Sequence, residues 1–165
     1  MRAALALLLL ALAACSGGKS PGNAAQPQDL ESAAIERGLV RDPDDGEIEG
    51  LYARDTDRVC IARAGTGYRI GAYVDYGERI TCSAAGTVSR SGETLRISLG
   101  QGDTCSFEAR YDGDHIRFPG ALSDGCKKFC ARRASLAGLE VARLSESAAE
   151  ATAMRDAGGR RLCGD

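Results

Sequence analysis

The chain has 165 residues, a length that fits one domain with short extensions. Its 21 basic residues are nearly balanced by 23 acidic residues, so it lacks the basic excess of a nucleic-acid-binding protein. Tryptophan is absent and glycine occurs 21 times, which favours a turn-rich fold over a bundle of helices.

The N-terminus carries the three parts of an export signal. Arg2 is the positive residue, residues 3–14 are all alanine or leucine, and Cys15 follows two small residues. The apolar run is shorter than the ~20 residues that span a bilayer. We therefore predict a signal peptide over residues 1–14, which is removed from the mature protein.

The motif Leu12-Ala13-Ala14-Cys15 resembles the lipobox of bacterial lipoproteins. In that family the cysteine becomes the first residue and carries three acyl chains, and more than one lipid signal gives stable membrane anchoring. Ser16 stands where an aspartate often retains such proteins in the inner membrane. The resemblance therefore implies lipidation at Cys15 and a location on the periplasmic side of the outer membrane. A plain secretory signal that merely precedes a cysteine is the alternative.

Residues 15–28 are rich in glycine, serine and proline, which predicts a flexible tether between the lipid and the domain. The domain is expected to cover residues 29–165. A short helix is predicted over residues 30–37, because Asp29 is a suitable N-cap and Gly38 a suitable stop.

From Glu47 onward, apolar residues recur at every second position, which is the period of half-buried strands. Seven such segments follow one another between turn residues, and residues 139–144 add an eighth. The pattern predicts a mostly β, antiparallel meander that closes into a small up-and-down barrel of about eight strands. An open sheet or a sandwich is the alternative.

A C-terminal helix is predicted after the strands. Ser147 and Glu150 form a capping box at its start, and Gly158-Gly159 stop the chain after about Asp156. The tail that follows ends close to Cys163, so we expect a disulfide to hold it against the body.

An even number of cysteines in an exported domain predicts a disulfide framework, and six remain after Cys15. The pairs expected are Cys82 with Cys105, Cys126 with Cys130, and Cys60 with Cys163. The spacing lacks the C-x-x-C of zinc knuckles and redox motifs, so no metal and no cofactor is expected.

No known catalytic motif is present, and we expect no enzymatic activity. The only histidine, His115, is predicted on the outward face of a strand without a nucleophile beside it. A basic cluster is either a solvated face or a contact patch for lipid head groups or an acidic partner; it consists of Lys127, Lys128, Arg132 and Arg133.

The predicted body resembles small β-barrel lipoproteins of the bacterial envelope, including lipocalin-like inhibitors of proteases and lysozyme. It shares their size, meander and disulfides, and has Gly50-Leu51-Tyr52 at its first strand. This resemblance implies a class of protein and not a function. From the sequence as a whole we expect a monomeric, membrane-tethered binding module for an envelope protein or a small ligand. The alternatives are a structural or accessory role in envelope assembly and inhibition of a periplasmic hydrolase. An open cavity in the barrel would favour the small ligand, and a packed interior would favour a protein.

Overall fold

The computed structural model describes residues 30–39 and 47–164, so the predicted signal peptide, Cys15 and the tether lie outside the described residues. The elements are, in chain order, α2 (Leu30–Glu36), β1 (Gly50–Arg54), β2 (Asp57–Ala64), β3 (Gly67–Asp75), β4 (Thr81–Ser91), β5 (Thr94–Leu99), η1 (Asp103–Cys105), β6 (Ser106–Tyr111), β7 (His115–Arg117), η2 (Asp124–Phe129), β8 (Glu140–Ser145) and α3 (Ala148–Ala153). Across these residues, no helix has the length and apolar character needed to cross a membrane.

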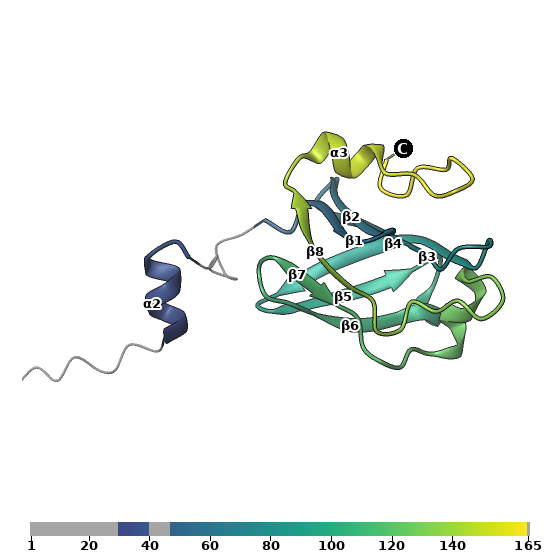
Figure 1. Cartoon of the computed structure of the whole chain (residues 1–165), viewed down its shortest axis with the longest axis horizontal. Helices are drawn as coiled ribbons and strands as arrows, with labels where there is room; N and C mark the ends of the chain where they lie inside the picture. Colours follow the sequence, from purple (N-terminus) through teal and green to yellow (C-terminus); the bar gives the residue numbers. More distant parts are fainter. Residues whose placement is uncertain (1–29, 40–46, 165) are drawn as a thin grey trace, which may run out of the picture.

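Eight antiparallel strands form a closed barrel, in which each strand pairs with its neighbours in sequence and β8 pairs with β1 (Figure 1). The predicted meander is therefore confirmed, and the open sheet and the sandwich are excluded. The helix predicted before the barrel is also present as α2. It ends in a Schellman motif at Gly38, where Leu39 N–H donates to the Ala34 carbonyl.

The interior of the barrel is filled by the inward-facing residues of all eight strands. They form one apolar cluster, which includes the fully buried Tyr52, Val59, Ile61, Ile70, Leu95, Leu99, Tyr111 and Ile116. An eight-stranded barrel is just narrow enough for its own side chains to fill it. The period of two in the sequence is the direct cause, since it places one apolar residue in the interior at every second position.

The two ends of the barrel differ. At the N-terminal mouth the chain enters β1, and three tight turns join β2 to β3, β4 to β5 and β6 to β7. At the opposite disulfide mouth lie the β3–β4 and β5–β6 loops and the long β7–β8 connection, at the right of Figure 1. This connection carries η2 and covers the disulfide mouth.

The β7–β8 connection is fastened by two disulfides, Cys105–Cys126 and Cys82–Cys130. Gly125 permits the close approach of η2 to the β5–β6 loop, because a Cβ there would lie 2.0 Å from the carbonyl oxygen of Thr104. The disulfide mouth is thus closed by covalent bonds and by tight backbone contact.

All six cysteines of the body form disulfides, and the predicted Cys60–Cys163 bridge is present with a Cα–Cα distance of 6.1 Å. The other two predicted pairings are wrong. β5 lies between β4, which carries Cys82, and β6, which Cys105 precedes. Strands are ~4.8 Å apart, so the two cysteines are too distant for a disulfide.

The predicted Cys126–Cys130 pair fails for a different reason. The sequence suggested one local helical turn closed on itself, whereas η2 runs across the mouth and leaves Cys130 in extended backbone after its end. Cys126 therefore reaches the β5–β6 loop, and Cys130 reaches the start of β4.

The C-terminal segment packs on the outside of the barrel, above β1 and β2 in Figure 1. Ser147 caps α3 by accepting the N–H of Glu150, as the capping box predicts. The helix ends at Ala153, before the predicted Asp156, because the Asp156 carboxylate accepts the N–H groups of Gly158 and Arg160 and organises a turn instead.

A second, smaller apolar cluster lies between this segment and the sheet, formed by Cys60, Ala62, Ala151, Met154, Leu162 and Cys163. Gly71 of β3 makes the contact possible, because a Cβ at this position would lie 2.4 Å from Cβ of Leu162. The outer face of the sheet is therefore partly covered by the chain's own C-terminus.

Candidate binding surfaces

The N-terminal mouth is closed by the buried side chain of Arg143, which is 6% exposed. Its guanidinium donates to the carbonyl oxygens of Gly113 and Glu49, both at 3.0 Å, and to the hydroxyl of Tyr111. It also lies over the ring of Tyr52, 4.8 Å from the centroid. The carboxylate of Asp114 lies 3.7 Å from its Nε, so the cation is held by an acidic side chain as well as by carbonyl oxygens and aromatic rings, and it covers this mouth of the barrel.

Tyr52 belongs to the same closure. Burial, together with the neighbouring Tyr111, raises its pKa far above the ordinary tyrosine value, so the phenol stays protonated. The phenol hydroxyl donates to the carbonyl oxygen of Ile48 at 2.9 Å. Tyr52 and Arg143 therefore fix the entering chain to the mouth of the barrel.

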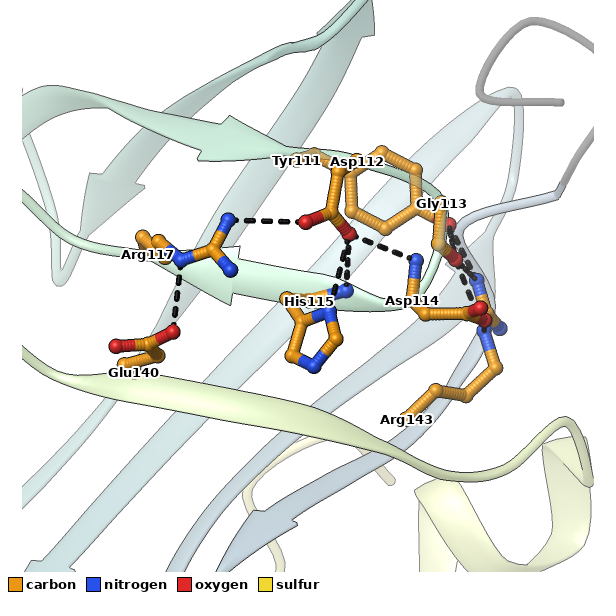
Figure 2. Close-up of polar contacts among 8 residues, drawn as sticks. All are labelled: Tyr111, Asp112, Gly113, Asp114, His115, Arg117, Glu140 and Arg143. Carbon is orange, nitrogen blue, oxygen red and sulfur yellow. Dashed lines mark hydrogen bonds and ion pairs between the residues drawn. The ribbon is translucent and has the colours of Figure 1, made fainter. Parts of the chain in front are cut away.

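His115 lies on the outer side of β7 beside Asp112, as Figure 2 shows. The His115 Nδ1 and Asp112 Oδ1 atoms are 3.3 Å apart, and the histidine side chain is 42% exposed. The other carboxylate oxygen of Asp112 accepts a hydrogen bond from Arg117 at 2.9 Å, and Arg117 also donates to Glu140 at 2.7 Å. These four residues form a chain of polar contacts on the surface that joins β7 to β8 and to the preceding turn.

Asp112 organises the turn between β6 and β7. Partial burial raises its pKa, but the N–H groups of His115 and Asp114 and the guanidinium of Arg117 outweigh burial, and the net effect is a lowered pKa. The ionised carboxylate thus accepts hydrogen bonds from backbone and side chain together.

The side chain of His115 contacts that of Asp112 in the described part of the chain. Among residues 30–39 and 47–164, no hydroxyl or thiol is hydrogen-bonded to His115, so no nucleophile is paired with a base there. Over the same residues, no three histidine, cysteine or acidic side chains gather in a way that could hold a metal ion.

An open groove of about 910 Å³ crosses the outer face of β3 to β6. The outward-facing residues that line the groove are of two kinds. Its floor consists of residues no larger than threonine, and larger charged side chains stand beside them. The floor residues are Gly67, Thr87, Ser89, Ser98 and Ser106, and the charged residues are Arg69, Arg96 and Glu108. The groove begins beside Cys163, because the Cys163 sulfur lies 4.0 Å from the carbonyl oxygen of Arg69, one of the lining residues.

The structure divides the predicted basic patch into two pairs. Lys127 forms an ion pair with Asp124 at 2.6 Å, and Lys128 donates to Oγ1 of Thr104 at 2.7 Å, so both lysines have partners within the disulfide mouth. Arg132 and Arg133 are exposed, and no carboxylate in the described part of the chain forms an ion pair with either.

Arg79 lies in the β3–β4 loop, which is joined to the segment that carries Arg132 and Arg133. The Cys82–Cys130 disulfide joins the two segments, and Ala131 N–H donates to the Thr81 carbonyl at 2.8 Å. The hydroxyl of Tyr76, in the same loop, also donates to the carbonyl of Ser135 at 3.3 Å, so the loop that carries Arg79 runs beside the segment that carries Arg132 and Arg133.

The backbone of this region is strained. Gly77, Glu78 and Arg79 follow one another at φ of 79°, 51° and 62°, and Arg132 has φ of 56°. Such conformations cost ~1–3 kcal/mol for a non-glycine residue and persist only where the surroundings hold them. Here Tyr76 N–H donates to the Ile80 carbonyl at 3.0 Å, and Ile80 N–H donates to the Gly77 carbonyl at 2.8 Å.

Sequence reasoning found Arg132 and Arg133 but missed Arg79 and the groove. Arg79 joins the patch through the Cys82–Cys130 bridge, and this pairing was predicted wrongly. The groove had a visible signal, because small residues alternate with apolar ones in residues 83–89. That signal was counted only as evidence for strands.

Comparison with known proteins finds no relative: no protein-family model matches the chain, and no curated protein or solved structure matches it. Two surfaces of the domain are candidates for binding a partner: the groove on β3 to β6 and the basic loops at the disulfide mouth.

Proposed function

We propose that this protein is a lipid-anchored, non-catalytic domain of the bacterial envelope that binds a partner protein through its outer surface. The filled interior of the closed barrel carries the proposal. A carrier of a small apolar ligand needs an open cavity, whereas here Arg143 closes one mouth and η2 covers the other.

Export to the envelope is supported by two independent features, and one of them also supports the lipid anchor. The lipobox Leu12-Ala13-Ala14-Cys15 provides the export signal and the lipidated residue. Outside it, all six cysteines form disulfides, the state expected of a chain that reaches an oxidising compartment. The membrane is then the site of attachment, and the domain is exposed to partners in the periplasm.

Inhibition of a periplasmic hydrolase is the second candidate function. It is favoured by the β3–β4 loop, which is exposed at Glu78 and Arg79 and braced by the Cys82–Cys130 bridge. A loop that is already ordered loses little entropy when an enzyme binds it. A structural role in envelope assembly has no comparable supporting contact.

The anchor is tested by intact mass of the protein extracted from membranes, together with counting of free thiols. We expect a chain that begins at a triacylated Cys15 and has no free thiol. An unlipidated mass would remove the anchor from the proposal.

The binding role is tested in living cells with a photoreactive amino acid placed at Tyr76, Ser89 or Leu144. These positions sample the disulfide mouth, the groove and the exposed outer face of β8. We expect a covalent adduct with one protein of defined mass from at least one position. Adducts from none of the three, or a small molecule that copurifies with the folded protein, would contradict the proposal.

A further inference from the structure

Three exposed arginines lie on the two segments that the Cys82–Cys130 bridge joins at the disulfide mouth, and together they are here called the arginine face: Arg79, Arg132 and Arg133. Most other basic side chains on the barrel have partners, such as Arg96 with Glu108 and Arg110 with Glu93. The arginine face has no ion pair with any carboxylate of the described chain. Its charge is therefore available to a partner.

The arginine face is also held in place before any partner arrives. The Cys82–Cys130 bridge and the Ala131–Thr81 hydrogen bond join its two segments. A second contact lies beside it, where the hydroxyl of Tyr76 donates to the carbonyl of Ser135 at 3.3 Å. Tyr76 nevertheless remains 60% exposed, so it adds an accessible aromatic ring to the surface.

The position of the arginine face bears on the kind of partner. The chain enters the barrel at Gly50, at the N-terminal mouth, whereas the arginine face lies at the opposite mouth. The predicted anchor precedes Gly50, so its tether joins the barrel at the N-terminal mouth. The arginine face lies at the mouth farther from that attachment.

We propose that the arginine face docks on a carboxylate-rich surface of a partner protein, with Tyr76 packing at its edge. This inference rests on the proposed function and names the surface that carries it. Guanidinium groups bind carboxylates through paired hydrogen bonds, which favours an acidic partner. Tyrosine and arginine are also the residues that most often dominate protein interfaces, and ordered loops lose little freedom on binding.

The first test measures binding of the whole domain to immobilised poly-L-glutamate, and to vesicles that contain 30% anionic phospholipid as the competing surface. We expect binding to poly-L-glutamate that weakens steeply with salt and falls at least tenfold in the triple variant Arg79→Gln, Arg132→Gln, Arg133→Gln. The matched control is Arg63→Gln, Arg110→Gln, Arg155→Gln, which removes the same charge from exposed arginines elsewhere and should change binding less than twofold.

Three results would overturn the inference. The first is an equal loss of poly-L-glutamate binding in both triple variants, which would show an effect of net charge alone. The second is binding to the anionic vesicles but not to poly-L-glutamate, and the third is no binding to either surface. Circular dichroism of each variant checks that the barrel is intact.

The photoreactive positions separate this inference from the proposed function. We expect the adduct at Tyr76, attached to an acidic segment of the partner and lost in the arginine triple variant. An adduct at Ser89 or Leu144 alone would overturn the arginine face and leave the proposed function standing. Adducts at none of them would overturn the proposed function itself.

Discussion

At the scale of single residues, glycines decide where other segments of the chain can pack closely against the barrel and its loops. Gly71 lies under Leu162, and Gly125 lies against the carbonyl of Thr104. Neither contact leaves room for a methyl group, so each glycine is required by packing. Small residues also form the groove, because its floor consists of glycine, serine and threonine.

Replacing Gly71 with alanine should lower the free energy of unfolding by about 2 kcal/mol, a typical cost of overpacking. The new Cβ would overlap Leu162 and Cys60, so the C-terminal tail has to move away from the sheet. Urea denaturation measures the loss. Gly67→Ala is the matched control, because nothing lies within 4 Å of a Cβ at that end of the same strand. Equal stability of the two variants would contradict the packing role of Gly71.

Asp112 predicts a pH dependence of stability. Its pKa is lowered in the folded protein, so its ionised form contributes stability at pH values above the unfolded pKa of ~3.9, and this contribution is lost as the pH falls through the folded pKa. Asp112→Asn should therefore destabilise the protein at pH 7 and much less at pH 3. Chemical denaturation at both values tests this, with Asp103→Asn as an exposed control. A loss that is the same at both pH values would exclude the ionised carboxylate as its cause.

At the scale of elements, the strands and their barrel were predictable, whereas the segments that cover the two mouths of the barrel were not. Alternation is a local signal, and it placed all eight strands, as in β3, where Ile70, Ala72 and Val74 face inward. The turns were equally local, because glycine and aspartate mark them directly. Helix α3 began where the capping box indicates, and only its end was misplaced.

The candidate surface depends on contacts between distant segments, which no local pattern encodes. Cys82 meets Cys130 only because the β7–β8 connection crosses the disulfide mouth. The path of that connection decides which arginines lie together. Arg132 and Arg133 were visible as a basic run, whereas Arg79 is far from them in the sequence and joins them only through the fold.

At the scale of the whole molecule, the protein consists of a barrel and an external C-terminal segment, residues 146–164, here called the strap. Two bridges close one mouth, whereas Cys60–Cys163 joins β2 to the C-terminal tail over a sequence separation of 103 residues. All eight strands lie between Gly50 and Ser145, so the strap contributes no strand to the barrel. Loss of the strap and loss of the barrel should therefore be separable.

The double variant Cys60→Ala, Cys163→Ala should keep the barrel and lose the strap. Opening a closed loop of about 100 residues costs up to ~4.7 kcal/mol in the chain-entropy model, so the melting temperature should fall sharply. Limited proteolysis should cut the chain after Ser145 while residues 50–145 stay protected, because the ladder from β1 to β8 is intact. Reduction of the unmodified protein should lower the melting temperature further, since it also opens the disulfide mouth. A melting temperature that is unchanged by reduction would show that the cysteines are not bridged. A strap that resists protease in the double variant would show that the apolar contacts of Leu162 and Met154 are enough to hold it.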